Sequence, residues 1–362
     1  MKSNGEKIAI DARMIEMSGI GTYIQHLMGC GIYDVAVGDE KTIRKYDKNV
    51  EVIQFTAPIY KLQEQLHFPE RELKKKGVDI IHFPHYNVPL SFKGRYAVTL
   101  HDLIHIIYPQ YLKNYAEAIY ARLLMGHALK HAEKIFTVSE CSKKDIEKYF
   151  HIDPSKINIT YNAVDGDFFR EKDRREVVYL LDKFHLPVGK KIILYVGNIK
   201  PHKNLSVLLR AYASLPNRDD YIVILVGKSF GTVPIQNMME ENGLSNGVIA
   251  TGAVTDNELV DLYNLADVFV FPSLYEGFGI PPLEAMSCGT PVICSNASSL
   301  PEVVGDSALL FDPLNSKELR DDIEQIFTDA QLKNELKMKG FARAKAFQWE
   351  RTQNIVKREL SI

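Results

Sequence analysis

The chain has 362 residues, 46% of them hydrophobic and 25% charged, so it can bury full-sized cores and is long enough for two domains. Its formal net charge of −2 argues against a nucleic-acid-binding protein, because such proteins carry a basic surface. No apolar run approaches the roughly 20 residues of a membrane span, and Met1–Glu6 do not read as a secretory signal. We therefore expect a cytoplasmic protein.

Short β-branched runs alternate with segments of helical spacing. In the first half, this pattern predicts helices within Tyr60–Lys75, Asn114–His131 and Ser142–Phe150. It predicts strands at Lys7–Ala12, Val50–Phe55, Asp79–Phe83, Tyr96–Leu100, Lys134–Val138 and Ile157–Tyr161. The segment from Met28 to Val50 shows one clear strand at most.

The second half repeats the scheme. Its predicted strands are Lys191–Val196, Tyr221–Val226, Val248–Thr251, Val268–Phe271, Pro291–Ser295 and Ala308–Phe311. Near-continuous apolar strands that alternate with helices indicate parallel sheets covered on both faces. The fold class is therefore α/β, with two doubly wound parallel-sheet domains.

The alternating pattern is interrupted by polar, turn-like residues between Asp165 and Lys190. We therefore expect an N-terminal domain over residues 1–168 and a second domain over residues 169–344. From about Lys339 the spacing is helical, and Trp349, the only tryptophan, lies near the middle of this tail. Residues 345–362 are expected to form a C-terminal helix.

Open parallel sheets bind ligands at the carboxyl ends of their strands, so the residues after each strand are candidates for a site. The loop and helix after Val268–Phe271 contain Glu276, Gly277, Phe278, Gly279, Ile280 and Glu284. Glycines allow a close backbone approach, the N–H groups of a helix start suit a diphosphate, and the two glutamates can accept hydrogen bonds from sugar hydroxyls. The alternative is an ordinary Gly-Pro loop whose acids complement the helix dipole.

The turn after Lys191–Val196 is a compact cationic spot. It contains Asn198, Lys200, His202 and Lys203. Cations at this place can neutralise the charge on a leaving diphosphate. Solvated loop lysines are the alternative.

Two features of the first half can serve the same ligand. Gly19 and Gly21 open a predicted helix, but Ile24 occupies the third glycine position of a dinucleotide motif, so only a tight turn is indicated. His101 follows the predicted strand Tyr96–Leu100. The alternative for His101 is a hydrogen-bonded structural histidine.

Asp165-Gly166-Asp167 has the D-x-D spelling of a metal site, but the sequence shows no partner ligand. Asp and Gly are favoured in turns, so we interpret the motif as a turn and expect no metal.

Seven stretches, in order along the chain, resemble the retaining GT-B glycosyltransferases of family 4. They are Gly19–Gly21 and residues 98–102 (VTLHD), 137–146 (TVSECSKKDI), 159–165 (ITYNAVD), 195–204 (YVGNIKPHKN), 250–263 (ATGAVTDNELVDLY) and 271–295 (FPSLYEGFGIPPLEAMSCGTPVICS). The last contains the family's two glutamates separated by seven residues. The glycine turn and "GNIKPHKN" are most similar to bacterial mannosyltransferases that build surface polysaccharides.

This resemblance implies two domains that face each other across a crevice, residues 1–168 on the acceptor side and residues 169–344 binding the nucleotide sugar. It also implies that the C-terminal helix, residues 345–362, crosses back to the N-terminal domain. It implies three catalytic residues: His101 near the reacting centre, Lys203 on the donor diphosphate and Glu276 on the hydroxyls of the transferred sugar. The remaining donor-binding residues are Gly19, Gly21, Asn198, Gly277, Phe278, Gly279, Ile280 and, on the nucleotide ribose, Glu284.

The chain departs from the family pattern in two places. Many relatives carry an arginine about five residues before the lysine, and this position lies near Asn198 here, so Lys200 or His202 is left to supply the second cation. The segment from Met28 to Val50 is short, and this region often shapes the acceptor site.

The implied activity is retaining, metal-independent transfer of a hexose, with GDP-mannose favoured over UDP-hexoses as donor. The expected acceptor is a hydroxyl of a saccharide or lipid-linked saccharide, and no cofactor or nucleic acid is expected. The helix Asn114–His131 can contact the inner membrane face or be an ordinary half-buried helix. Two alternatives remain: other GT-B chemistry (a phosphorylase or epimerase) and a non-catalytic sugar-nucleotide-binding protein.

Overall fold

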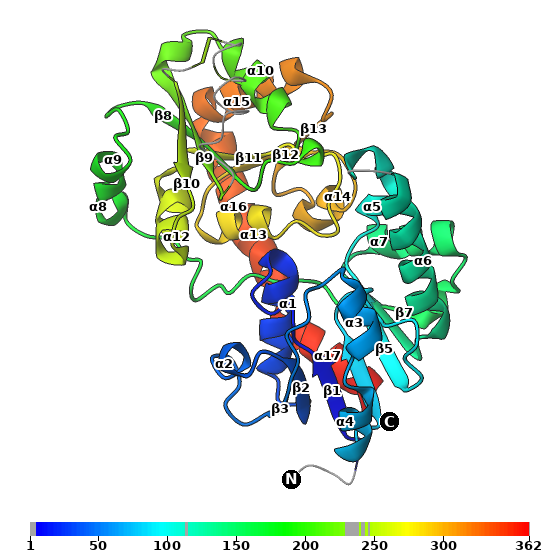
Figure 1. Ribbon diagram of the computed structural model, residues 1–362. Coiled ribbons are helices and arrows are strands. Elements are labelled where there is room, and N and C mark those ends of the chain that lie inside the picture. Colours follow the sequence, from blue (N-terminus) through cyan, green and yellow to red (C-terminus); the bar gives the residue numbers. More distant parts are fainter. Residues whose placement is uncertain (1–4, 113–114, 229–238, 240–242, 245–246, 362) are drawn as a thin grey trace. The chain divides into compact units, whose positions relative to one another are not determined.

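The computed structural model describes residues 5–112, 115–228, 239, 243–244 and 247–361. The chain divides into unit 1, Met1–Asn162 with Gln348–Ile362, and unit 2, Ala163–Phe347. Each unit is built on one parallel sheet (Figure 1). The chain therefore enters unit 2 after Asn162 and leaves it after Phe347, where the sequence suggested residues 168 and 344.

The sheet of unit 1 has the strand order β3-β2-β1-β4-β5-β6-β7 among the described residues. The strands are β1 (Ile8–Asp11), β2 (Val35–Gly38), β3 (Glu51–Gln54), β4 (Ile80–Phe83), β5 (Arg95–Leu100), β6 (Lys134–Thr137) and β7 (Ile157–Ile159). Strands β1, β2 and β4 are buried along their whole length, which fits a parallel sheet covered on both faces. Each strand predicted for the first half is confirmed, and β2 is the strand between Met28 and Val50.

The helices of unit 1 are α1 (Ser18–Met28), α2 (Glu40–Ile43), α3 (Leu62–His67), α4 (Glu70–Lys75), α5 (Ile104–Ile107), α6 (Tyr115–His131), α7 (Glu140–Phe150) and α17 (Trp349–Leu360). The helical segment predicted over Tyr60–Lys75 is divided in two. Phe68 has an extended backbone (φ −57°, ψ 134°) because it precedes Pro69, and residues before proline avoid the helical conformation.

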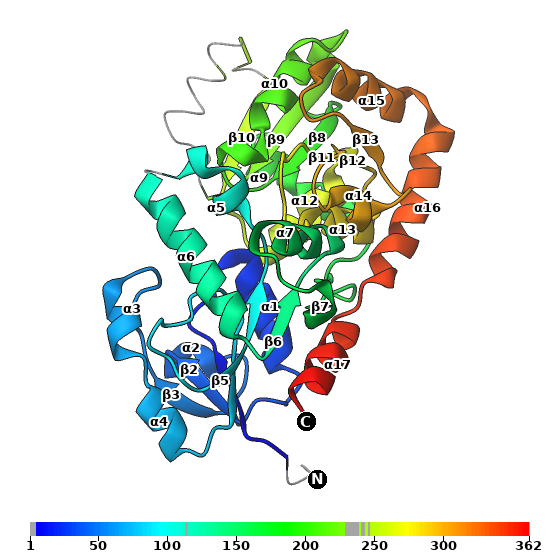
Figure 2. The ribbon, with the colours of Figure 1, turned by 90° about the vertical axis from the view of Figure 1, so that its right-hand side faces the viewer.

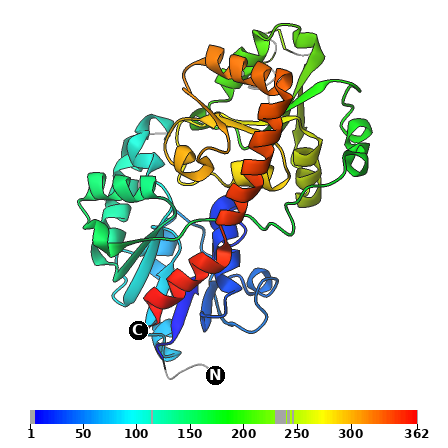
Figure 3. The same ribbon diagram turned by 180° about the vertical axis from the view of Figure 1, so that it is seen from behind.

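The C-terminal helix α17 packs against α1 of unit 1 (Figure 3). The Trp349 ring stacks on His26 with 4.2 Å between ring centroids, and Gln353 Nε2 donates a hydrogen bond to the His26 carbonyl oxygen at 2.6 Å. The Thr352 hydroxyl donates to the carbonyl oxygen of Tyr161. Helix α17 is therefore a structural part of unit 1.

A buried chain of polar side chains links α1 to the middle of the unit 1 sheet. His82 Nδ1 lies 2.8 Å from the Tyr33 hydroxyl, and its Nε2 lies 2.8 Å from the Thr99 hydroxyl. The Tyr23 hydroxyl connects Thr99 to Thr160, at 3.4 Å and 3.0 Å. Burial lowers the pKa of His82 to about 3, so this histidine is neutral at physiological pH.

The sheet of unit 2 has the order β10-β9-β8-β11-β12-β13 among the described residues. The strands are β8 (Lys191–Val196), β9 (Tyr221–Val226), β10 (Val248–Gly252), β11 (Val268–Phe271), β12 (Val292–Ser295) and β13 (Leu309–Phe311), as predicted. The helices are α8 (Arg174–Val177), α9 (Tyr179–Lys183), α10 (Leu205–Ala213), α12 (Asp256–Leu265), α13 (Ile280–Ser287), α14 (Leu300–Val304), α15 (Ser316–Thr328) and α16 (Ala330–Ala346). Helix α15 packs on α10, and α16 packs on α13 (Figure 2).

The helical tail predicted from about Lys339 is interrupted between α16 and α17. Phe347 is extended (φ −101°, ψ 118°), and its ring meets the edge of Phe278 at a centroid distance of 5.4 Å. The Arg343 guanidinium lies 4.9 Å from the centroid of the Phe347 ring. These contacts hold Phe347 in unit 2, so the helix ends at Ala346 and a new one begins at Trp349.

Helix α6 buries one face and exposes the other. Leu124, Met125 and Ala128 are buried, whereas Ile119 and Leu123 are 49% and 65% exposed. Within the described part of the chain, no helix is both long enough and apolar enough to cross a bilayer.

Replacing His82 by glutamine is expected to reduce the loss of stability of unit 1 in acid. Between the ordinary histidine pKa of 6.5 and the folded value of about 3, the unfolded chain binds a proton that the folded chain does not. The free energy of unfolding contributed by His82 is therefore fully present above pH 6.5 and falls by about 1.4 kcal/mol per pH unit below it.

Urea unfolding followed by the fluorescence of Trp349, at about pH 7 and about pH 5.5, measures this slope in unit 1. The exposed His67→Gln variant is the control and should keep the wild-type slope. An unchanged slope in His82→Gln would show that His82 does not carry the effect.

Candidate functional site

The strand order of unit 2 reverses beside β8, whose neighbours are β9 and β11. The loops after β8 and β11 therefore leave the carboxyl edge of the sheet next to each other, at the point where open α/β sheets bind ligands. Hydrogen bonds join these loops: for example, Leu274 N donates to the His202 carbonyl oxygen at 2.7 Å, and Asn204 Nδ2 donates to the Pro272 carbonyl oxygen at 3.1 Å. This edge of the sheet is the candidate site of unit 2.

Lys203 and Glu276 form an ion pair between these two loops. The distance from Lys203 Nζ to Glu276 Oε1 is 2.6 Å, and the side chains are 19% and 14% exposed. The ammonium also lies 5.4 Å from the centroid of the Phe271 ring. An ammonium group has three donors, so Lys203 can hold Glu276 and still donate to a phosphate oxygen.

Two serines fix the shape of the loop after β11. Ser298 Oγ accepts a hydrogen bond from Glu276 N at 2.9 Å, and the Ser299 hydroxyl lies 3.0 Å from the Glu276 carbonyl oxygen and 2.8 Å from that of Phe278. Both serines follow β12, so inspecting the residues after this strand would have found them. The sequence analysis did not single them out.

Gly279 occupies a backbone position that requires glycine. Its φ is +102°, and a Cβ atom there would lie 2.6 Å from Leu300 Cδ2. It directly precedes α13, whose first turn contains Pro281, at a position where the missing N–H group of proline leaves no helical hydrogen bond unmade. The loop Gly277–Ile280 is therefore held in one conformation at the start of the helix.

Glu284 lies in α13 and accepts a hydrogen bond from the Tyr263 hydroxyl at 2.8 Å. Burial raises the pKa of Glu284 to about 7, although the Tyr263 bond acts in the opposite direction. Tyr263 comes from α12, and the sequence analysis did not identify it as a partner of Glu284. The protonation of Glu284 can therefore change near neutral pH.

The remaining residues of the turn after β8 have different environments. Asn198 is exposed, and its carbonyl oxygen lies 3.5 Å from the Tyr195 hydroxyl. Lys200 is exposed and His202 is buried. Of the two candidates for a second cation, Lys200 is therefore the solvent-accessible one.

His101 follows β5 in unit 1 and is buried. Its Nε2 lies 2.9 Å from the carbonyl oxygen of Pro84, and the edge of its ring meets Tyr23 at a centroid distance of 5.0 Å. A carbonyl oxygen only accepts, so Nε2 carries the proton and Nδ1 is the acceptor of the neutral ring. Burial lowers the pKa of His101, which favours this neutral form.

Gly19 and Gly21 lie in the first turn of α1, as the sequence predicts. Gly19 is exposed. A Cβ atom on Gly21 would lie 2.6 Å from the carbonyl oxygen of Ile15, so this glycine lets the preceding loop pack against the helix. The close packing at this position therefore explains why it is a glycine, independently of any ligand.

The Asp165-Gly166-Asp167 motif is a turn, and this interpretation is confirmed. The Asp165 carboxylate accepts hydrogen bonds from the backbone N–H groups of Asp167 and Phe168, at 3.1 Å and 3.2 Å. The carboxylate thus stabilises its own backbone.

The structure therefore places the predicted residues in two groups. Unit 2 holds Asn198, Lys203, Glu276, Gly277, Phe278, Gly279, Ile280 and Glu284, and unit 1 holds Gly19, Gly21 and His101. Within unit 2, Lys203 and Glu276 are in direct contact.

Solved structures with the same fold cover almost the whole chain. Sucrose-phosphate synthase from Thermosynechococcus elongatus superposes with a TM-score of 0.80 at 20% identity, covering 98% of both chains. HepE from Anabaena, solved with UDP and glucose, gives the same TM-score, identity and coverage. The predicted fold class is thus confirmed: the chain has the GT-B fold, with two parallel-sheet α/β domains.

Family models and relatives then define the family. The model "Glycosyltransferase Family 4" matches residues 37–168, and "Glycosyl transferases group 1" matches residues 180–343. O-antigen chain mannosyltransferase B of Escherichia coli is 36% identical over 274 residues, which are 75% of this chain and 71% of that protein. The chain therefore belongs to family 4 of the glycosyltransferases and is a hexosyltransferase.

Two other relatives are matched over less of their length. O-antigen chain mannosyltransferase RfbU of Salmonella typhimurium is 31% identical over 243 residues, 67% of this chain and 63% of that protein. Serotype-specific mannosyltransferase WbdA of Escherichia coli is 34% identical over 284 residues, 76% of this chain, but the chain spans only 34% of its length.

Gly279→Ala is expected to destabilise unit 2 by about 1–3 kcal/mol, because alanine is strained at this positive φ and its Cβ would meet Leu300. Gly166→Ala is the matched control, since no atom lies within 4 Å of a Cβ there. Thermal unfolding monitored by circular dichroism compares the two variants with the wild type. Equal unfolding temperatures for all three proteins would show that alanine is not strained at position 279.

Proposed function

We propose that this hexosyltransferase is a retaining, metal-independent enzyme that transfers mannose from GDP-mannose to a hydroxyl of a saccharide or lipid-linked saccharide. The observation that carries the proposal is the Lys203–Glu276 pair in unit 2, set beside a rigid loop that leads into α13. The pair lies at the topological switch point, where a nucleotide is bound in doubly wound folds.

Each donor role follows the family resemblance. Lys203 binds the diphosphate, the Gly277–Ile280 backbone meets the sugar and phosphates, and Glu284 holds the ribose. Glu276 holds the hydroxyls of the transferred sugar. Gly19 and Gly21 close over the donor from unit 1, and the neutral His101 offers Nδ1 to a sugar hydroxyl.

The mechanism needs no nucleophile from the protein. Glu276 is engaged by the Lys203 ammonium, and a carboxylate held by a cation is a weak nucleophile. The diphosphate leaves while Lys203 balances its charge, and the acceptor hydroxyl attacks the same face of the sugar. The leaving phosphate takes the proton of that hydroxyl. Glycosidases, in contrast, place two carboxylates across the bond.

Metal independence rests on the same charges. In this proposal Lys203 neutralises the leaving diphosphate, which a divalent cation does in other glycosyltransferases. The carboxylate of Asp165, in the one D-x-D motif that the sequence analysis weighed, is engaged by its own turn.

The choice of mannose rests on the relatives, which include two mannosyltransferases named for the O-antigen chain. If the acceptor is lipid-linked, the enzyme acts from the cytoplasm and contacts the inner face of the membrane, where the lipid is embedded. The exposed Ile119 and Leu123 on α6, with Arg122 between them, support such a peripheral contact.

The donor site is tested by a thermal-shift panel of nucleotides and nucleotide sugars, with and without EDTA, on the wild type and Glu284→Ala. GDP and GDP-mannose should raise the melting temperature of the wild type equally with and without EDTA, and the rise should be lost in the variant. No shift with any nucleotide would refute the donor site, and a shift abolished by EDTA would refute metal independence.

The affinity for GDP-mannose measured in this panel should depend on pH. Only ionised Glu284 accepts two hydroxyl groups, and its pKa is about 7. The affinity for GDP-mannose should therefore increase up to about tenfold from about pH 6 to about pH 8, and Glu284→Gln should remove this increase. The sugar nucleotide is the right probe because its diphosphate does not titrate in this range.

Lys203→Ala is expected to reduce turnover by about two to three orders of magnitude, because the leaving diphosphate loses a preset cation. Lys317→Ala, an exposed lysine of α15, is the control and should keep wild-type turnover. Release of GDP from GDP-mannose in the presence of acceptor measures the rate. Near-normal turnover in Lys203→Ala would remove this lysine from the mechanism.

A further inference from the structure

Residues 298–300 follow β12 and support the loop of the candidate site at three points. The Ser298 hydroxyl accepts a hydrogen bond from Glu276 N at 2.9 Å and donates one to the Glu276 carbonyl oxygen. The Ser299 hydroxyl lies 3.0 Å from the same carbonyl oxygen. Leu300 lies so close to Gly279 that a Cβ atom there would be 2.6 Å from Leu300 Cδ2. The position of Glu276 therefore depends on the position of this segment.

Ser298 has an unusual backbone conformation. Its φ is +56°, a left-handed value that residues with a side chain rarely adopt. Such a conformation is unfavourable by itself and persists where the surrounding structure holds it. The contact of Ser298 with Glu276 therefore needs support from outside the loop.

Arg343 of α16 supplies this support at the other end of α14. Its Nε donates a hydrogen bond to the Val303 carbonyl oxygen at 2.7 Å, and its Nη2 donates to that of Glu302. Gly305 lies against the guanidinium, since a Cβ atom there would be 3.6 Å from Arg343 Cζ. The last carbonyl groups of a helix lack partners within the helix, and the helix dipole favours a cation beside them. Arg343 therefore fixes α14 and, with it, the residues that contact Glu276.

The same guanidinium also reaches the loop by a second route. It lies 4.9 Å from the centroid of the Phe347 ring, and this ring meets the edge of Phe278 at a centroid distance of 5.4 Å. Phe278 is buried and belongs to the loop that leads into α13. A guanidinium donates hydrogen bonds at its edge and stacks on aromatic rings with its flat face. Arg343 thus uses its edge on α14 and its face on Phe347.

Helix α16 gives Arg343 a fixed origin. It packs on α13, and the contact is close, because a Cβ atom on Gly340 would lie 3.1 Å from Met286 Cγ. Helix α13 begins at Ile280 of the site loop and carries Glu284. Arg343 therefore connects the loop to a helix that is itself packed against the site.

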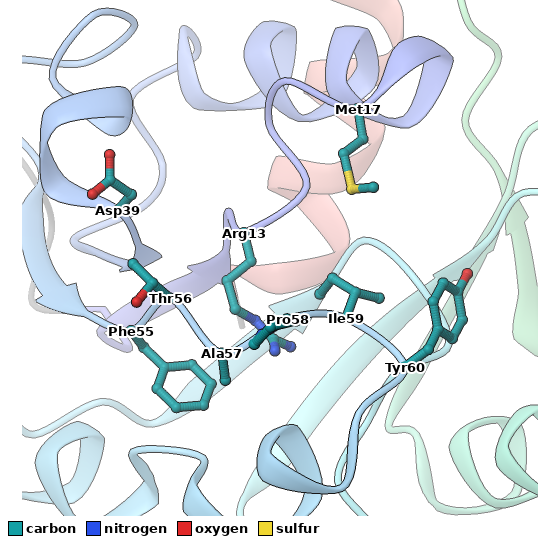
Figure 4. A pocket seen from close by; sticks show the side chains of 9 residues that line it. All are labelled: Arg13, Met17, Asp39, Phe55, Thr56, Ala57, Pro58, Ile59 and Tyr60. Carbon is teal, nitrogen blue, oxygen red and sulfur yellow. The ribbon is translucent and has the colours of Figure 1, made fainter.

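Arg13 of unit 1 shows a different use of an arginine. It lines a pocket of about 440 Å³ together with residues such as Phe55 (Figure 4). Its Nη2 lies 2.6 Å from Asp11 Oδ2 and 3.2 Å from Glu64 Oε1, so its partners are carboxylate side chains. Arg343 instead donates to main-chain carbonyl oxygens, and it therefore fixes the course of a backbone segment.

We infer that Arg343 is a positioning residue for sugar transfer, which acts through Ser298 and Phe347 to hold Glu276 in the geometry that the transition state requires. The inference rests on the proposed role of Glu276 on the hydroxyls of the transferred sugar. A misplacement of about 1 Å in a reacting geometry can cost about two orders of magnitude in rate. Loss of Arg343 therefore affects turnover more than it affects the binding of a nucleotide without the sugar.

The test compares the wild type with Arg343→Met, which keeps a long side chain but has no donors. Turnover is the release of GDP from GDP-mannose with an α-linked mannose disaccharide as acceptor, and GDP binding is measured by calorimetry, both well below the unfolding temperature of each protein. Turnover should fall at least about tenfold, while the affinity for GDP changes by less than about threefold. Arg343→Lys keeps the charge and one donor group, so it should recover part of the loss.

A double-mutant cycle with Ser298→Gly tests the route through α14. Glycine removes the hydroxyl and adopts the positive φ freely, so turnover should fall in this variant as well. Because Arg343 acts through Ser298, the loss of turnover in the double variant should be smaller than the product of the two separate losses.

Lys345→Met is the control, because Lys345 is an exposed residue of the same helix, and it should behave like the wild type. Unchanged turnover of folded Arg343→Met, equal losses of turnover and GDP affinity, or losses that multiply in the cycle would each overturn the inference. A wild type that releases no GDP from GDP-mannose would instead refute the proposed donor, and the comparison is then made with the nucleotide sugar that most stabilises the wild type.

Discussion

The parallel arrangement of the strands determines where chemistry can occur in this protein. Parallel strands bring all their carboxyl ends to one edge of the sheet, and the strand order reverses once in each unit, between β1 and β4 and between β8 and β11. The loops on the two sides of a reversal diverge and leave room for a ligand. Lys203, Glu276 and Arg13 all follow strands that border these reversals.

The cations Lys203 of unit 2 and Arg13 of unit 1 are paired differently. Lys203 has a compact ammonium paired with one carboxylate, so it can still donate to an incoming phosphate. Arg13 is paired with two carboxylates, so its charge is balanced within the fold, and Nη1 has no hydrogen-bond partner among the described residues. Lys203 therefore keeps donors available, whereas the charge of Arg13 is balanced by its neighbours.

Much of the fold and part of the site follow from the sequence. The strands are identifiable because buried parallel strands are nearly continuous apolar runs, and Glu276 and Glu284 because of their spacing beside glycines and prolines. The contact of Arg13 with Glu64 joins residues 51 positions apart, and no local pattern reveals it. The same holds for Tyr263 on Glu284 and for Ser298 on Glu276, since each partner comes from another element.

Helix α17 has a consequence for the order in which the protein forms during translation. The first 162 residues leave the ribosome first, but unit 1 also needs Trp349 on His26 and Thr352 on Tyr161. Unit 2 is contiguous from Ala163 to Phe347, so it can be completed while unit 1 still waits for its last helix. In the nascent chain, the segment synthesised first is therefore the one finished last, and until then it exposes the face of α1 that α17 will cover.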